Sequence, residues 1–149
     1  MAVCVQVDDF DLSAEMALMT AGRADIGALV SFTGLVREIN GGGGMELEHY
    51  PGMTEKALQK IEAEARSRWD LQDCRIIHRY GPLEAGAQIV LVLTASKHRQ
   101  MAFEAAEFIM DFLKSRAPFW KKESGRGWVD ARESDEAALA RWKADITKT

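Results

Sequence analysis

The stretch from Gln88 to Ala95 contains the unbroken apolar run Ile-Val-Leu-Val-Leu. Such a run predicts a central β-strand covered on both faces, because a strand with one face in water would alternate apolar and polar residues. Directly after it, residues 99–117 carry apolar side chains at helical spacing on one face and charged residues on the other. The chain is therefore expected to fold into a sheet with helices packed against it.

Shorter patterns predict the remaining elements. Alternating apolar residues predict strands at 3–7, 26–37, 45–50, 74–80, 119–121 and 127–129. Helices are predicted at 13–21, from Thr54 (as its cap) to Trp69, and at 133–143. Hairpins dominate this order of elements, so the 149 residues indicate one α+β domain over 1–149, without repeats or a long linker.

A run of four glycines interrupts the pattern at Asn40–Gly44. A phosphate-binding loop is one interpretation, but the segment lacks the G-x-x-x-x-G-K-[ST] motif and no helix is predicted to begin after it. The favoured interpretation is a flexible hairpin connection that returns the chain from the 26–37 strand into the 45–50 strand.

The net charge of -4 argues against a general nucleic-acid-binding protein, which would need clustered positive charge. The charge is unevenly spread, however. Between Thr94 and Arg126 there are seven Lys or Arg and four Asp or Glu, so this segment is cationic in an otherwise acidic chain. A cationic segment of this size favours a small anionic ligand over a polymer.

The cysteines and histidines do not have the spacing of a metal site. Cys4 and Cys74 lie far apart and form no C-x-x-C pair, and the histidines are equally scattered at His49, His78 and His98. No metal and no cofactor are therefore expected, and His78 is interpreted as a structural histidine. The chain begins without a basic-then-apolar leader and has no apolar run of membrane-spanning length, so a cytoplasmic location is expected.

A basic segment follows the long predicted helix. From Lys114 to Glu123, Pro118 breaks the helix and four cations surround the pair Phe119–Trp120. Crowded cations can hold an anion, and lysines can transfer protons. The competing interpretation is ordinary surface and core: cations that complement a helix dipole, buried aromatic rings, and an ion pair between Lys114 and Asp111 one turn away. The residues alone leave both interpretations open.

Two further basic sites lie at the ends of predicted elements. Arg37 ends the second strand, and His98–Arg99 stand where the buried strand enters the long helix, a junction whose free backbone N–H groups suit an anion. No Ser-His-Asp or Cys-His arrangement can be assembled from the sequence. The pattern indicates an enzyme that positions an anionic substrate while the reactive atom arrives from elsewhere.

Seven segments, in this order, cover nearly the whole chain after Ile26: Phe32-Thr-Gly-Leu-Val-Arg37, Leu47-Glu-His-Tyr-Pro-Gly-Met53, Ile77-His-Arg-Tyr-Gly81, Ser96-Lys-His-Arg99, Ala105–Lys114, Arg116-Ala-Pro-Phe-Trp-Lys121 and Trp128-Val-Asp-Ala-Arg132. Together they closely resemble the large, catalytic subunit of molybdopterin synthase. Leu35 departs from the family pattern, in which a lysine is frequent at this position. The resemblance implies an α+β, α/β-hammerhead-like domain: a largely antiparallel sheet with packed helices and a small extra β subdomain.

The resemblance also implies a function in molybdenum cofactor biosynthesis. The family is a sulfurtransferase that converts cyclic pyranopterin monophosphate (precursor Z) into molybdopterin by inserting two sulfurs as a dithiolene. The sulfur comes from the C-terminal thiocarboxylate of a small, ubiquitin-like sulfur-carrier subunit. Two large subunits form a central homodimer within a heterotetramer. A partner's thiocarboxylate would account for the missing nucleophile.

The family's functional residues can be carried over onto matching positions of this chain. Lys114 and Lys121 match the two catalytic lysines, with Lys121 assigned to the thiocarboxylate or acyl intermediate and Lys114 to substrate binding and proton transfer. The other substrate-binding positions share a match to the pterin-phosphate pocket, and they are Arg37, His98, Arg99, Lys122, Glu123 and Arg132. Arg132 is expected to reach the pocket from the neighbouring large subunit. The sequence leaves open which lysine acts as acid and which as base.

Two other functions compete with the sulfurtransferase. A non-catalytic anion-binding or assembly module would keep the fold and the basic residues without the chemistry. A nucleic-acid-binding α+β domain is disfavoured by the acidic charge and by the lack of an aromatic-rich RNA-binding strand.

Overall fold

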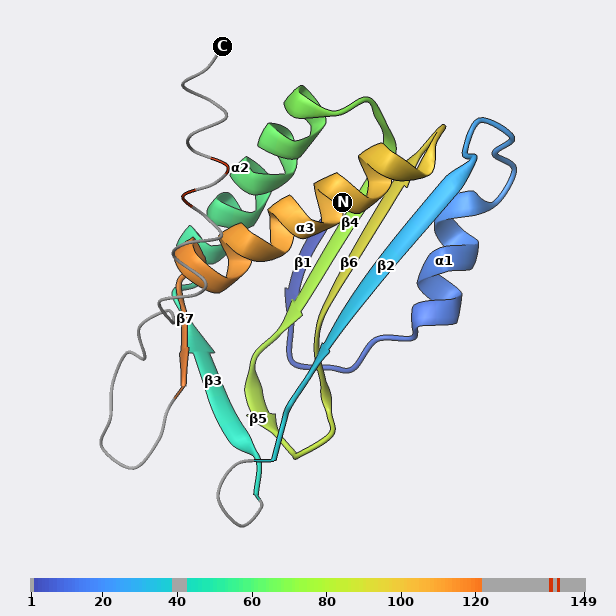
Figure 1. The fold of residues 1–149 in the computed structure, drawn as a ribbon. Helices are drawn as coiled ribbons and strands as arrows, with labels where there is room; N and C mark the ends of the chain where they lie inside the picture. Colours follow the sequence, from blue (N-terminus) through green and yellow to red (C-terminus); the bar gives the residue numbers. More distant parts are fainter. Residues whose placement is uncertain (1, 39–42, 122–139, 141, 143–149) are drawn as a thin grey trace.

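The computed structural model describes residues 2–38, 43–121, 140 and 142. Its larger part is a four-stranded sheet with the order β1-β4-β6-β2 (Figure 1). The strands are β1 Val3–Gln6, β2 Ala28–Leu35, β4 Leu71–Arg79 and β6 Gln88–Ser96. β1 runs parallel to β4, whereas β6 is antiparallel to both of its neighbours. The largely antiparallel α+β arrangement expected from the sequence is confirmed.

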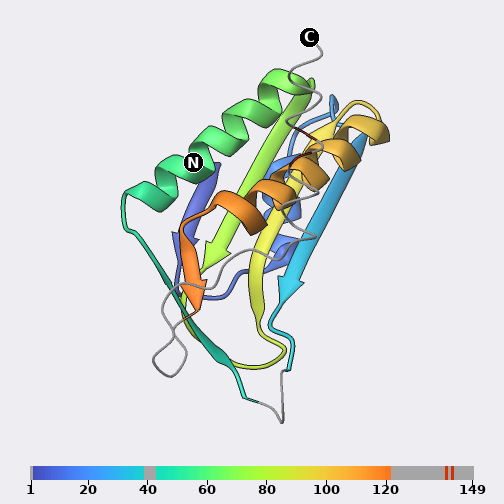
Figure 2. The same cartoon turned by 60° about the vertical axis from the view of Figure 1, so that its left-hand side comes forward.

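Helices cover both faces of this sheet (Figure 2). The helix α1, Leu12–Thr20, packs on one face against Leu91 and Leu93. The helices α2, Met53–Arg68, and α3, Arg99–Arg116, pack on the other face against Val90 and Val92. All four of these β6 side chains are buried, which confirms the sequence prediction of a strand covered on both faces. Among the described residues, no helix is long and apolar enough to cross a bilayer.

A second, three-stranded sheet lies beyond the end of the first (Figure 1). Its order is β5-β3-β7, with β3 Met45–His49 antiparallel to both β5 Gly81–Leu83 and β7 Phe119–Lys121. A small core of Val36, Leu47 and Leu83 lies against it. The predicted extra β subdomain is confirmed, and so is the predicted strand at 119–121.

The predicted hairpin between the 26–37 and 45–50 strands is wrong. β2 is paired along its length with β6 instead, and β3 belongs to the other sheet. After β2 the backbone N–H of Val36 donates to Ala87 O at 2.8 Å, and Gly86 N donates to Val36 O at 2.7 Å. These bonds hold the chain where it leaves the first sheet. Residues 39–42 of the glycine run lie outside the described part.

The start of α2 differs from the prediction that Thr54 caps it. The N-cap is Gly52, whose N–H donates to Glu55 Oε2 at 2.6 Å. Thr54 lies inside the helix and is fully buried, and its hydroxyl donates to the carbonyl oxygen of Tyr50 at 2.8 Å. A threonine at a helix start can thus serve either as cap or as core, and the local sequence does not separate these roles.

Only Ala140 and Trp142 are described from the predicted C-terminal helix at 133–143, and both are helical. The predicted strand at 127–129 lies outside the described residues. Trp142 is buried, with its ring edge-on to Trp69 at 5.7 Å and to Phe108 at 5.5 Å between centroids. This contact packs Trp142 against Phe108 of α3 and against Trp69, which ends α2.

A buried hydroxyl ties β6 to α3. Thr94 is fully buried, and its Oγ1 donates to Ala102 O at 2.6 Å. The nearly isosteric change Thr94→Val is expected to lower the free energy of unfolding by about 1 kcal/mol, because one intramolecular hydrogen bond is lost. Urea denaturation measures this. The matched control is Thr33→Val on the edge strand β2, for which a change within about 0.5 kcal/mol is expected. An equal loss in the free energy of unfolding for the two variants would contradict a stabilising hydrogen bond between Thr94 and Ala102.

Candidate functional site

Lys121 lies on the inner face of the second sheet, the face that carries Leu47 of the small core. Side chains alternate along a strand, so Phe119 and Lys121 share one face of β7 with their register partners His49 and Leu47. Trp120 points to the other face, where its indole Nε1 donates to Glu48 Oε2 at 3.1 Å. Because Leu47 and Phe119 belong to the small core, Lys121 is a half-buried cation beside apolar side chains.

Lys114 lies in the last turn of α3 and is exposed. The helix ends at Arg116 and β7 begins at Phe119, so the two lysines stand on either side of one short turn. No ion pair joins Lys114 to Asp111 among the described residues. The Asp111 carboxylate accepts a hydrogen bond from the Trp142 indole. The surface ion pair considered from the sequence therefore does not account for Lys114.

A cluster of aromatic and imidazole rings lies against β7, between the two sheets. The ring of His78, from β4, is stacked on Phe119 with 3.6 Å between centroids and 15° between planes. His49, from β3, lies 5.9 Å from Phe119 and 4.4 Å from Tyr80. We call His49, His78, Tyr80 and Phe119 the ring cluster.

Both histidines of the ring cluster have a defined proton position. The hydroxyl hydrogen of Thr54 is donated to Tyr50 O, so Thr54 Oγ1 must accept the 2.9 Å hydrogen bond from His49 Nδ1. His78 Nδ1 lies 2.8 Å from Arg79 O, which can only accept, so this nitrogen also carries a hydrogen. These bonds fix the orientation of both rings.

His78 is uncharged at neutral pH. Burial lowers its pKa from 6.5 to about 4, and the electrostatic interactions with His49 and Lys114 act in the same direction. The hydrogen bond to Arg79 O opposes the shift without overcoming it. The sequence interpretation of His78 as a satisfied buried histidine is consistent with these contacts.

Arg37 lies near this end of the molecule too. It is exposed and directly follows Val36, which packs in the same small core as Leu47, the register partner of Lys121. The described part of the chain therefore brings three predicted site residues to one end of the fold: Arg37, Lys114 and Lys121.

His98 and Arg99 are placed differently. His98 is the N-cap of α3 and Arg99 is its first residue, and both are exposed. At about 1.5 Å per residue, α3 separates Arg99 from Lys114 by about 22 Å, so one chain does not bring them together. Lys122, Glu123 and Arg132 lie outside the described residues.

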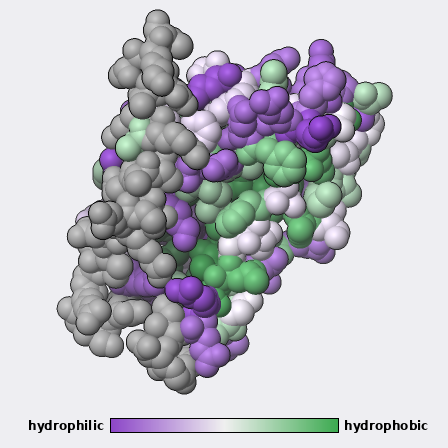
Figure 3. Space-filling model, in the orientation of Figure 1, coloured by the Kyte–Doolittle hydropathy of each residue, from purple (hydrophilic) through white to green (hydrophobic). Residues whose placement is uncertain are grey.

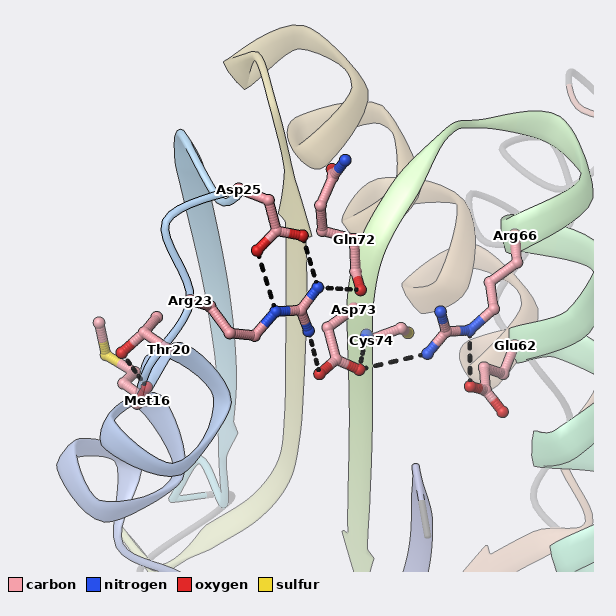
Figure 4. A network of polar contacts seen from close by, with 9 residues as sticks. All are labelled: Met16, Thr20, Arg23, Asp25, Glu62, Arg66, Gln72, Asp73 and Cys74. Carbon is pink, nitrogen blue, oxygen red and sulfur yellow. Dashed lines mark hydrogen bonds and ion pairs between the residues drawn. The ribbon is translucent and has the colours of Figure 1, made fainter.

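The other polar cluster of note lies away from this site (Figure 4). Arg23 bridges Asp25 and Asp73 at 2.8 and 3.2 Å, and Asp73 also pairs with Arg66 at 3.3 Å. These half-exposed pairs connect the α1–β2 loop and α2 to β4. Beside them burial raises the pKa of the Cys74 thiol to about 12, which makes it a poor nucleophile. Among the described residues no group of His, Cys, Asp or Glu could hold a metal ion.

Known proteins resemble this chain over most of its length. The family model described as MoaE protein matches residues 5–116. The chain belongs to the MoaE family. The molybdopterin synthase catalytic subunit of Ralstonia nicotianae is 62% identical over 144 residues, covering 93% of this chain and 82% of that protein. That of Mesorhizobium japonicum is 56% identical over 148 residues, covering 95% and 93%.

Solved structures agree with the family assignment. The molybdopterin biosynthesis MoaE protein of Burkholderia ambifaria superposes with a TM-score of 0.84 at 56% identity, covering 95% of this chain and 98% of that one. The resemblance to this family stated from sequence motifs is confirmed. What the sequence did not indicate is the ring cluster, because its members come from three separate segments and meet only through the contact between the two sheets.

Proposed function

We propose that this MoaE-family chain is the catalytic subunit of a molybdopterin synthase. It would transfer sulfur to cyclic pyranopterin monophosphate, and its sulfur donor would be the C-terminal thiocarboxylate of a small carrier protein. The observation that carries the proposal is the placement of Lys114 and Lys121 on either side of one turn, with Arg37 at the same end. This gathers cations for a phosphate and a thiocarboxylate in a chain whose relatives bear that enzyme's name.

The reaction can be divided between the donor and this chain. The carrier's sulfur would attack a carbon of the pyranopterin and displace the oxygen substituent bound there, which takes the electron pair and leaves as a protonated group. Water would then cleave the acyl carbon–sulfur bond, leaving sulfur on the substrate and a carboxylate on the carrier. Lys121 would hold the thiocarboxylate and the acyl carbonyl, and Lys114 would hold the substrate and move a proton. The buried thiol of Cys74 is unsuited to carry sulfur itself. By resemblance, Lys122 and Glu123 would flank the substrate.

A second copy of the chain would complete the site. His98 and Arg99 are too far from Lys114 in one chain, and Arg132 was assigned by resemblance to the neighbouring subunit. The edge strand β2 and the first half of α3 expose four large apolar side chains, Phe32, Leu35, Met101 and Phe103. Figure 3 shows apolar surface on the face that α3 and β2 share. Such a surface suits a homodimer, and two small subunits would then give a heterotetramer.

Reconstitution tests the proposed reaction. The chain is incubated with the thiocarboxylated small subunit and precursor Z, and molybdopterin is assayed as its fluorescent oxidised derivative. Product formation is expected. A folded complex without product would support the competing non-catalytic anion-binding or assembly module. A cytoplasmic location and action as one domain over 1–149 belong to the same proposal.

The dimer surface has its own prediction. Phe32→Glu is expected to shift the chain from dimer to monomer in sedimentation velocity, because a carboxylate would be buried without a partner. The matched control is Leu18→Glu, on the exposed side of α1, where the side chain is 75% exposed. The control should remain dimeric. A Phe32→Glu chain that stays dimeric at micromolar concentration would place the interface elsewhere.

Mixed dimers test whether His98–Arg99 act from the second copy. Lys121→Ala and Arg99→Ala chains, each impaired alone, are unfolded together and refolded. If Arg99 serves the neighbour's site, random two-fold assembly leaves one intact site in half of the dimers, or about a quarter of wild-type activity. Recovery no greater than the sum of the separate variants would mean that Arg99 acts within its own chain or not at all.

A further inference from the structure

The ring cluster contains a histidine that the proposed chemistry does not use. His78 is buried near the end of β4, an inner strand of the first sheet, where Val5 of β1 and Val90 of β6 are its register partners. Its Nδ1 hydrogen is held by a backbone carbonyl, and its ring face is held by Phe119. Burying a polar imidazole here costs free energy of desolvation, which an apolar side chain of similar size would not cost.

The stacking partner of His78, Phe119, belongs to a short strand. β7 has three residues and is joined to β3 through the pairs Phe119–His49, Trp120–Glu48 and Lys121–Leu47. Three paired residues hold a strand weakly. A slip of one residue would turn every side chain of β7 to the opposite face. Lys121 would then leave the inner face and point to the side of the sheet that carries Glu48.

The contact between His78 and Phe119 opposes that slip. Phe119 stands two residues before Lys121 on the same face, so the position of its ring determines on which side Lys121 emerges. β4 lies between two partners in the first sheet and is therefore a rigid support. His49 adds a second contact to Phe119 and is itself fixed by Thr54.

We propose that His78 is a positioning residue for sulfur transfer: stacked on Phe119, it holds β7 in the register that presents Lys121 to the incoming thiocarboxylate. This inference rests on the proposed function for its consequence in turnover, but the geometry of Lys121 can be tested without turnover. His78 touches no substrate in this scheme and acts only through Phe119.

Three variants separate positioning from simple destabilisation. His78→Ala removes the stacked ring, and His78→Phe restores a ring of similar shape. Ile76→Ala removes a buried side chain from the same strand that packs in the main core and belongs to no ring pair with Phe119. All three are compared at a temperature where each is folded by circular dichroism.

The expected result in turnover is a selective loss of kcat. His78→Ala should lower kcat at least about tenfold, because a misplaced catalytic group slows the chemical step. The KM for the thiocarboxylated small subunit should rise less than kcat falls, because Lys121 is one contact to the tail of that subunit but acts directly in the chemical step. His78→Phe should recover kcat to within about threefold, and Ile76→Ala should retain it. Equal kcat in the two alanine variants, or no recovery in His78→Phe, would overturn the proposal.

The second readout needs no substrate. The rate of chemical acylation of the Lys121 amino group, followed by mass spectrometry, should rise several-fold in His78→Ala, as the lysine leaves its half-buried position. It should return to the wild-type rate in His78→Phe and stay there in Ile76→Ala. If the wild-type chain makes no molybdopterin, the proposed function fails while this labelling pattern still decides the positioning role. Unchanged labelling in His78→Ala would overturn that role in an active enzyme as well.

Discussion

Replacing Lys121 with alanine is expected to lower the rate of molybdopterin formation about a hundredfold or more, without unfolding the chain. The physical reason is the position of this cation. It is half-buried on the inner face of β7, so an anionic thiocarboxylate beside it is less screened than at an open surface. Single-turnover formation of molybdopterin from precursor Z and the thiocarboxylated small subunit measures the loss.

Lys60→Ala is the matched control. Lys60 is an exposed lysine of α2, far along the chain from β7, and its loss should leave the rate within about twofold of wild type. Lys121→Arg adds a test of geometry, because a guanidinium keeps the charge but not the shape or the proton chemistry of an amine. A Lys121→Ala enzyme that turns over within threefold of wild type would remove Lys121 from the catalytic assignment.

The stability of the fold is expected to fall as the pH drops from 6.5 towards 4, with His78 as one identifiable cause. In the folded chain its pKa is lowered to about 4, mainly by burial and further by His49 and Lys114. The unfolded chain takes up a proton here as the pH falls through 6.5, whereas the folded chain does so only near 4. The stabilisation is therefore complete above pH 6.5 and is lost through this window, by roughly 3 kcal/mol at most.

The measurement is urea unfolding at pH 7 and at pH 4.5, for wild type and for His78→Phe. Carboxylates titrate in both proteins, so the difference between their pH dependences isolates the imidazole. Wild type should lose more stability than the variant on acidification. Nuclear magnetic resonance titration of the His78 ring provides a direct check, and a normal midpoint near 6.5 would contradict the explanation.

The parts of the fold that the sequence predicted correctly are those decided by short-range pattern. The β6 strand and α3 follow from an apolar run and from a helical stripe, each of which lies within a single segment. The error over β3 arose because strand pairing is a choice among distant partners. A glycine-rich connection permits a hairpin between β2 and β3, but in the structure β2 pairs with β6.

The candidate site divides in the same way. Motif resemblance selected Lys114 and Lys121, and the fold places them together at the end of α3. Resemblance also selected His98 and Arg99, which lie at the start of α3, whereas Lys114 lies in its last turn. The motifs do not show that the length of this helix separates the two groups. The stacking of His78 on Phe119 could not be read from either segment, since it depends on how the two sheets meet.

The strand order β1-β4-β6-β2 has a consequence for how the protein is made. Val3 pairs with Ile76, and Ala28 pairs with Ser96, so the strands that leave the ribosome first find their partners only after much of the chain has been synthesised. Because β6 pairs with both β2 and β4, the strand pairing of the first sheet cannot be completed until β6 has left the ribosome. Non-local pairing of this kind folds slowly and leaves apolar strands exposed in the nascent chain. Assembly of the sheet is thus delayed until late in translation. Until then the unpaired apolar strands of the nascent chain are available to chaperones that bind extended apolar segments.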